Sequence, residues 1–152
     1  MGSPQQQSKK HEFSLPEDID KFLIKQDIKP SYHRIMILKY LWNNKDHPTV
    51  NMIYKSLSKK IPTLSKTTVY NTVTLFQKKR IITSLPGNEN ELRYDFNTDM
   101  HVHFKCIKCD RIYDIEVSKN FSLIDKKELE GHMILDYQIC LKGICQYCKK
   151  KR

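Results

Sequence analysis

The sequence lacks an apolar run long enough to span a bilayer, and it lacks a charged leader followed by an apolar stretch and a cleavage site. It also lacks internal repeats, apart from two Cys-x-x-Cys units. These features argue against export and membrane insertion. We therefore expect a soluble, cytoplasmic protein with no membrane partner.

Positive charge is what the chain has in excess. Its 152 residues include 27 lysines and arginines against 17 acidic residues, a net charge of +10, and this length suits one or two small domains. Such a balance favours nucleic acid as a partner, because basic side chains displace the counterions condensed on phosphate. The charge could instead only aid solubility. The polar, Gln-rich N-terminus predicts a disordered arm over residues 1–13.

Four of the five cysteines form two pairs with the spacing of metal ligands. Cys106 and Cys109 are one pair, and Cys145 and Cys148 are the other. In a reducing compartment this pattern predicts one closed, tetrahedral Cys₄ zinc site; buried apolar thiols or disulfides are the alternative. The fifth cysteine, Cys140, lies in an apolar stretch, and we expect it to be a buried thiol rather than a reactive one.

His101 and His103 precede the first cysteine pair and need a different explanation, because a Cys₄ site has no free coordination position. In an extended strand, residues two apart project from the same face. Both imidazoles can therefore converge on a second ion. A surface or core role is the ordinary alternative for a single histidine.

The N-terminal part of the chain predicts four helices, each preceded by a residue that can cap it. The first begins with the capping box Ser14-Leu15-Pro16-Glu17 and ends near Asp27. The other three follow Ser31, Thr49 and Ser65. Because a short turn joins the third helix to the fourth, this pair predicts a helix-turn-helix.

The fourth helix carries polar side chains that could contact DNA. In a helix-turn-helix, residues near the N-terminus of the second helix reach base edges in the major groove. The exposed residues expected here are Lys66, Thr67, Tyr70 and Asn71. An ordinary surface helix is the alternative.

The predicted strands fall into two groups. Residues 81–85 and 92–96 predict a hairpin, the wing of a winged helix. Arg93 could reach phosphate from this wing, and an exposed arginine that is only solvated is the alternative. After a polar break, residues 101–106, 111–117, 122–130 and 133–141 predict the order strand, strand, helix, strand, with Gly131 ending the helix. The fold class is therefore α+β: a winged helix-turn-helix domain over residues 14–97, followed by a small α/β domain over residues 98–152 that carries the zinc site.

Several motifs occur in the order and spacing of the ferric uptake regulator superfamily, which the chain resembles over nearly its whole length after the N-terminal arm. They are His47-Pro48-Thr49, Ser65-Lys66-Thr67-Thr68-Val69-Tyr70-Asn71, Arg93-Tyr94-Asp95-Phe96, His101-Val102-His103 and the two cysteine pairs. The resemblance implies a homodimeric, metal-dependent repressor of a double-stranded DNA operator, in which the second domain serves dimerisation. At the entry to the second helix, only a capping hydroxyl and Arg34 match the family pattern, and Arg34 would contact DNA.

The resemblance also implies two metal sites. The structural zinc ion would be held by the four paired cysteines. The regulatory metal would be held by His47, Asp95, His101, His103 and Asp114. Their nitrogen and oxygen donors suit Fe²⁺ or Mn²⁺.

Within the superfamily, the pattern is most similar to the peroxide-responsive branch, PerR. Aspartate at both Asp95 and Asp114, and Asn71 after the tyrosine, resemble that branch. The resemblance implies repression of oxidative-stress genes until peroxide, reacting at bound Fe²⁺, oxidises His47 or His101. An iron- or zinc-uptake regulator of the same family is the alternative. We expect that the protein is not an enzyme, and a metalloenzyme is the weaker reading, since no second catalytic cluster accompanies these residues.

Overall fold

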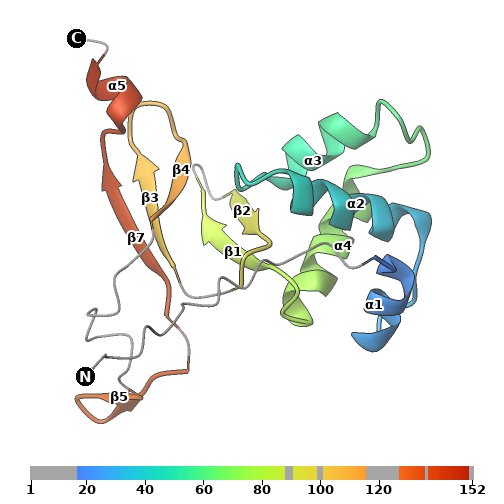
Figure 1. Cartoon of the computed structure of the whole chain (residues 1–152), viewed down its shortest axis with the longest axis horizontal. Coiled ribbons are helices and arrows are strands. Elements are labelled where there is room, and N and C mark those ends of the chain that lie inside the picture. The colour runs from blue at the N-terminus through green and yellow to red at the C-terminus, as the bar shows by residue number, and fades with distance from the viewer. Residues whose placement is uncertain (1–16, 88–90, 99–100, 116–126, 136, 151–152) are drawn as a thin grey trace, which may run out of the picture.

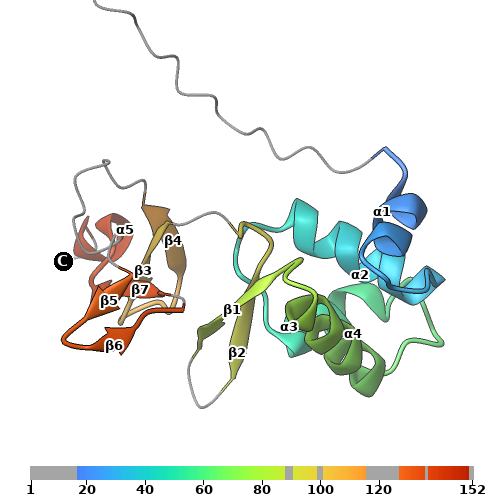
Figure 2. The ribbon, with the colours of Figure 1, turned by 90° about the horizontal axis from the view of Figure 1, so that it is seen from below.

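The structure is a computed structural model that describes residues 17–87, 91–98, 101–115, 127–135 and 137–150. Figures 1 and 2 show two halves side by side: an N-terminal half of helices and one hairpin (residues 17–98), and a C-terminal half built on strands (residues 101–150). This arrangement confirms the predicted α+β fold class. Among the described residues, no helix is both long and apolar enough to cross a membrane.

Four helices form most of the N-terminal half: α1 (Ile19–Lys25), α2 (Tyr32–Asn43), α3 (Val50–Leu57) and α4 (Lys66–Lys78). The last three have the predicted N-caps: the hydroxyls of Ser31, Thr49 and Ser65 accept backbone N–H groups at 3.3, 3.2 and 3.0 Å. The first helix starts later than predicted, with Asp18 as its N-cap. The predicted cap Ser14 lies outside the described residues.

Helices α1 and α4 end in the same way, with a left-handed residue that is not glycine. Asp27 follows α1 with φ +56°, and Arg80 follows α4 with φ +55°. In each case the next backbone N–H reaches back 2.9 Å to a carbonyl five residues earlier, that of Leu23 or Phe76. This is the Schellman motif, which turns the chain sharply and satisfies the terminal carbonyls.

One hydrophobic core holds the N-terminal half together. Its largest fully buried side chains come from all four helices and include Leu23, Leu38, Ile53 and Phe76. Burial of side chains of this size contributes about 1.5–3 kcal/mol each. Phe96, just beyond the hairpin, packs against Trp42 of α2 edge to face with ring centroids 4.8 Å apart, which fixes the hairpin to the helices.

The predicted wing is present as an antiparallel hairpin of β1 (Thr83–Pro86) and β2 (Leu92–Asp95). Residues 46–49, between α2 and α3, lie along the outer side of β2. There the Tyr94 N–H donates to the Pro48 carbonyl at 3.0 Å, and Thr49 forms a β-bridge with Arg93. The loop before α3 is therefore held beside the end of the wing.

The C-terminal half contains a three-stranded sheet in the order β4-β3-β7. Strand β3 (Val102–Cys106) pairs antiparallel with β4 (Ile112–Ile115) and parallel with β7 (Ile139–Gly143). A short hairpin of β5 (Glu128–Leu129) and β6 (His132–Met133) and a terminal helix α5 (Gln146–Lys150) complete this half.

Two predictions for the C-terminal half are wrong. Residues 122–126 of the predicted helix lie outside the described residues, but Glu128–Leu129 is strand β5 rather than the end of a helix. Glu130 and Gly131 have φ +50° and +82°, the signs that a tight two-residue hairpin requires, so Gly131 turns a hairpin instead of ending a helix. The last strand begins at Ile139 rather than Met133, and α5 was not predicted.

Candidate metal centres and DNA-binding surface

The four paired cysteines come together at one end of the C-terminal sheet. Cys106 ends β3, Cys109 follows in the next turn, Cys145 directly precedes α5 and Cys148 lies in its first turn. All four sulfur atoms lie within 4.8 Å of one another, and those of Cys109 and Cys145 are 3.7 Å apart. A tetrahedral ion with Zn–S bonds of about 2.3 Å holds its sulfur atoms about 3.8 Å apart. The cluster therefore has the size of a Cys₄ zinc site.

The ionisation of the thiols also calls for a cation. The backbone N–H of Cys145 donates to the Cys106 sulfur at 3.3 Å and lowers the pKa of Cys106. The neighbouring Cys109 sulfur, together with burial, raises the pKa of Cys148 to about 12. Because close thiolates repel one another, all four can ionise together only around a cation. Zn²⁺, which prefers thiolate ligands, fits this donor set.

Cys140 is not buried as predicted but exposed. It lies on β7, which pairs with β3 along one edge and is the outer strand of the described sheet. An apolar sequence on an outer strand does not guarantee burial. Cys140 is also not part of the Cys₄ cluster.

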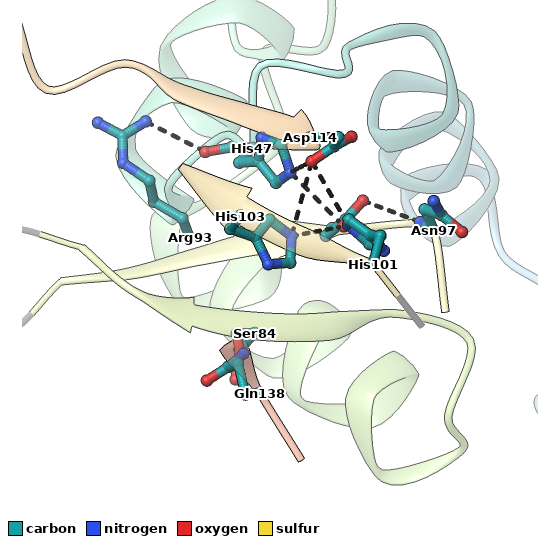
Figure 3. Close-up of polar contacts among 9 residues, drawn as sticks. His47, Ser84, Arg93, Asn97, His101, His103, Asp114 and Gln138 are labelled. Atoms are coloured by element: carbon teal, nitrogen blue, oxygen red, sulfur yellow. Dashed lines mark hydrogen bonds and ion pairs between the residues drawn. The ribbon is translucent and has the colours of Figure 1, made fainter. Parts of the chain in front are cut away.

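Five nitrogen and oxygen donors converge at a second site, between the two halves. They are His47 from the loop before α3, Asp95 at the end of β2, His101 just before β3, His103 on β3 and Asp114 on β4. One donor atom from each lies within 4.8 Å of the others, and Figure 3 shows the labelled members pointing toward one another.

The distances within this His/Asp site suit a single metal ion. His47 Nε2 lies 3.0 Å from Asp114 Oδ1, and His101 Nε2 lies 3.0 Å from Asp95 Oδ2. Ligands at about 2.1 Å from an ion have neighbouring donor atoms about 3.0 Å apart. The strand register contributes directly, because His103 stands opposite Asp114 in the β3–β4 ladder. The donors are imidazoles and carboxylates without sulfur, which suit Fe²⁺ or Mn²⁺.

The buried histidines and carboxylates of this site shift one another's pKa values. The side chains of His47 and Asp95 are only 2% and 9% exposed. Burial alone would lower the pKa of His47, but the carboxylates of Asp114 and Asp95 outweigh it and raise the pKa to about 9. Burial opposes ionisation of the two carboxyls, yet the surrounding histidines hold their pKa values well below the usual range. His47 Nε2 faces both carboxylates, 3.0 Å from Asp114 Oδ1 and 3.5 Å from Asp95 Oδ2, so a bound ion would take the place of the proton held between them.

His47 is held in an unfavourable backbone conformation at this site. Its φ is +50°, a left-handed value that costs a residue other than glycine on the order of 1 kcal/mol. Its neighbours hold it there: its carbonyl accepts from Arg93 Nη1 at 3.2 Å, and the following Pro48 carbonyl accepts from Tyr94. The loop therefore presents the imidazole to Asp95 of the same half and to Asp114 of the other half.

A cleft of about 590 Å³ leads to His101 and His103 from the side of β1 and the segment before β7. The Gln138 side-chain amide donates to the Ser84 carbonyl at 2.6 Å and so links the two halves beside this cleft (Figure 3). His101 and His103 thus lie at the wall of this cleft, with only 11% and 5% of their side chains exposed.

The predicted DNA-contacting residues lie on one helix and one adjacent segment. Lys66, Thr67, Tyr70 and Asn71 are all exposed, in the N-terminal half of α4. Arg34 of α2 is half-buried and donates to the Lys29 carbonyl, and it lines a cavity of about 340 Å³ together with Asn71. The four α4 side chains are thus free of the core, and one of them, Asn71, lies beside Arg34.

Arg93 has a role that the sequence did not indicate. Its side chain is only 15% exposed and pairs with Asp110 at 2.9 Å, so the expectation that it reaches phosphate is wrong. Asp110, which directly follows the first cysteine pair, was not singled out. Its position in the turn after Cys109 is the only local signal, because such turns often need a left-handed residue.

Comparisons with known proteins agree with this geometry. The model of the ferric uptake regulator family matches residues 25–141. The peroxide-responsive repressor PerR of Staphylococcus epidermidis is 31% identical over 134 residues, which cover 85% of this chain and 87% of that repressor. The peroxide operon regulator of Bacillus subtilis is 34% identical over 128 residues, covering 82% and 85%. The structure of the ferric uptake regulator of Francisella tularensis with iron is similar, with a TM-score of 0.67 at 26% identity, covering 80% of this chain and 95% of that one.

Proposed function

The chain belongs to the ferric uptake regulator family, and we propose that it is a metal-dependent, homodimeric transcriptional repressor that senses hydrogen peroxide and controls oxidative-stress genes. Members of this family are DNA-binding transcriptional regulators rather than enzymes. In this proposal residues 14–97 bind operator DNA and residues 98–152 dimerise and hold metal. The two curated relatives named above, both peroxide regulators, support the peroxide-sensing assignment.

The observation that carries the proposal is the division of the His/Asp site between the two halves. His47 and Asp95 come from the N-terminal half, whereas His101, His103 and Asp114 come from the C-terminal half. An ion bound by both sets fixes the angle between α4 and the C-terminal sheet. In a dimer, that angle sets the distance between two α4 helices, and DNA half-sites lie at fixed helical spacing. Metal binding and DNA binding therefore favour each other by the same factor.

The exposed residues of α4 support DNA binding by this half. Lys66 can neutralise phosphate, and Thr67, Tyr70 and Asn71 can exchange hydrogen bonds with base edges or backbone. Arg34 adds a second cation beside Asn71. The zinc ion in the Cys₄ site would hold the turn and α5 at the end of the C-terminal sheet.

The sensing chemistry we propose is oxidation of a ligand histidine. Fe²⁺ held by these ligands would give one electron to cleave the O–O bond of hydrogen peroxide and would regain one when the ring is oxidised, so that hydrogen peroxide is the net oxidant. The net change inserts one peroxide oxygen into a ring C–H bond of His47 or His101, and the other oxygen leaves as water. The oxidised ring is a poorer donor, so the halves lose their common ion and the DNA is released. Bound Mn²⁺ would repress without this reaction.

Peptide mass spectrometry of the iron-loaded dimer on operator DNA, after mild peroxide, tests this function. We expect a gain of about 16 Da, one oxygen atom, on His47 or His101, in parallel with release of the DNA. The manganese-loaded protein is the control for the metal. His132, an exposed histidine outside the site, is the internal control for non-specific oxidation.

Two results would contradict this assignment. Oxygen confined to cysteines or methionines would place the sensing elsewhere. DNA release on metal removal, with no response to peroxide, would instead identify an iron- or zinc-uptake regulator.

A further inference from the structure

A partly buried ion pair joins the two halves between the two metal clusters, and neither of its members is a donor in either cluster. Arg93 of β2 belongs to the N-terminal half, and Asp110 belongs to the turn between β3 and β4 in the C-terminal half. Arg93 Nη2 lies 2.9 Å from Asp110 Oδ2, with side chains 15% and 30% exposed. A charge-assisted hydrogen bond with this much burial is stronger than an exposed surface pair.

On the N-terminal side, the same guanidinium holds the loop that carries His47. Arg93 Nη1 donates to the His47 carbonyl at 3.2 Å (Figure 3). Because a guanidinium is a rigid fork, one group can satisfy the carbonyl and the carboxylate together. Arg93 also lies two residues before Asp95 on β2. Its position therefore bears on both N-terminal ligands of the His/Asp site.

On the C-terminal side, Asp110 belongs to the turn of the Cys₄ cluster. It directly follows Cys109, and its backbone N–H donates to the Cys106 carbonyl at 2.9 Å. Its other carboxylate oxygen lies 3.4 Å from Lys105 Nζ on β3. The carboxylate is thus placed by the turn that the cysteines close.

The backbone at Asp110 shows that the side chain is not required for the turn. Its φ is +59°, a conformation that glycine adopts without cost and that aspartate and asparagine tolerate better than other residues. Glycine would make this turn equally well. What aspartate adds is the carboxylate that reaches Arg93.

We propose that the Arg93–Asp110 ion pair is a strut, meaning a rigid link between the Cys₄ turn and the His47 loop. Through this link, the zinc ion held by the cysteines sets the affinity of the His/Asp site for the regulatory metal. Arg93 and Asp110 are positioning residues, since neither is a donor in the metal clusters. The inference rests on the proposed function for the role of the His/Asp site. The physical link between the halves can be measured without it.

Asp110→Asn and Asp110→Gly are the test variants. Asparagine keeps the size and the tolerance for a left-handed backbone but removes the charge, and glycine removes the side chain without backbone strain. Asp27→Asn is a matched control: Asp27 also has a left-handed backbone, φ +56°, and pairs with Lys79 at 2.9 Å, but both partners lie in the N-terminal half.

Three quantities are measured on the full-length, zinc-containing protein: zinc content, Mn²⁺ affinity by electron paramagnetic resonance titration, and, without Mn²⁺, hydrogen exchange of the Tyr94 amide, which donates to the Pro48 carbonyl of the His47 loop. In both Asp110 variants we expect zinc to be retained, Mn²⁺ affinity to fall about tenfold, as loss of about 1.4 kcal/mol implies, and the Tyr94 amide to exchange faster. Asp27→Asn should change none of these. Arg93→Lys, which cannot bridge both partners, should weaken Mn²⁺ binding similarly, and Arg93→Lys with Asp110→Asn should be no worse than either alone.

The outcomes separate the strut from the function on which it rests. Unchanged Mn²⁺ affinity and exchange in Asp110→Asn would overturn the strut, as would loss of zinc, which would show that Asp110 only supports the Cys₄ turn. If the wild-type protein bound no Mn²⁺ at the His/Asp site, the proposed function would fail. Faster exchange of the Tyr94 amide in the Asp110 variants would then still support the mechanical link.

Discussion

Removal of zinc should unfold the C-terminal half and leave the N-terminal half folded. Within the described C-terminal half, the buried apolar side chains are Val102, Cys106, Ile112 and Cys145, and two of these are cysteines of the zinc cluster. Burial contributes about 1.5–3 kcal/mol for a large apolar side chain. Strands β3, β4 and β7 have five, four and five residues, and each ordered residue costs about 1–2 kcal/mol. Structural Zn²⁺ contributes about 10–16 kcal/mol in zinc-finger peptides, enough to offset the excess of the ordering cost over the burial energy.

The N-terminal half has no such dependence, since its core cluster draws on all four helices. Cys148→Ser removes one zinc ligand, and Cys140→Ser, outside the cluster, is the matched control. Hydrogen exchange followed by mass spectrometry should show β3 and β7 exchanging at least about a hundredfold faster in Cys148→Ser, equivalent to about 2.7 kcal/mol. Helices α2 and α4 should stay protected. Cooperative loss of protection in both halves, or continued protection of β3 without zinc, would refute the reasoning.

Ser65→Ala should lower the free energy of unfolding in urea by about 1 kcal/mol, because it removes the N-cap of α4; Thr67→Ala, in the same turn, is the control. Lys66→Ala should weaken binding to all DNA sequences alike and reduce the slope of log affinity against log salt by about one, whereas Lys25→Ala on α1 should not. Mn²⁺ affinity should rise about tenfold per pH unit between pH 7 and 8.5, since the metal must displace a proton from His47, whose pKa of about 9 lies above its ordinary 6.5; a flat profile in titrations would argue against His47 as a ligand. Because folding raises the pKa of His47, its protonation stabilises the metal-free fold, and this contribution is complete below pH 6.5. The free energy of unfolding in urea should therefore lose this contribution as the pH rises through 9.

Local chemistry is what the sequence predicted well. Ser31, Thr49 and Ser65 cap their helices because a side-chain hydroxyl can satisfy an N–H two or three residues ahead, whatever the rest of the chain does. The two cysteine pairs were equally easy to interpret, since their spacing and their thiolate ligands restrict the kind of metal site they can form before the fold is known. His103 on β3 and His101 just before it project to the same site for a similarly local reason, since they are two residues apart in extended backbone.

Properties that depend on distant partners were not predictable in this way. Residues 128–133 have helical composition, but the β5–β6 hairpin depends on the left-handed pair at Glu130 and Gly131, and glutamate gives no turn signal. Cys140 was expected to be buried because its neighbours are apolar, although burial depends on what covers β7. Arg93 contacts Asp110 and the His47 carbonyl, and neither contact has a local sequence pattern.

The chain has few glycines, so its left-handed turns were hard to predict from the sequence, and one of these turns carries His47 of the His/Asp site. The chain has four glycines, yet Asp27, His47, Arg80, Asp110 and Glu130 all adopt positive φ. Each position would be less strained as glycine, by about 1–2 kcal/mol, but glycine would remove the side chain. Three of these side chains make contacts that a glycine could not: Asp27 pairs with Lys79, Asp110 pairs with Arg93, and His47 contributes to the His/Asp site. At these three turns the backbone strain is therefore tolerated because the side chain links segments that are distant in sequence, and at two of them it links the two halves.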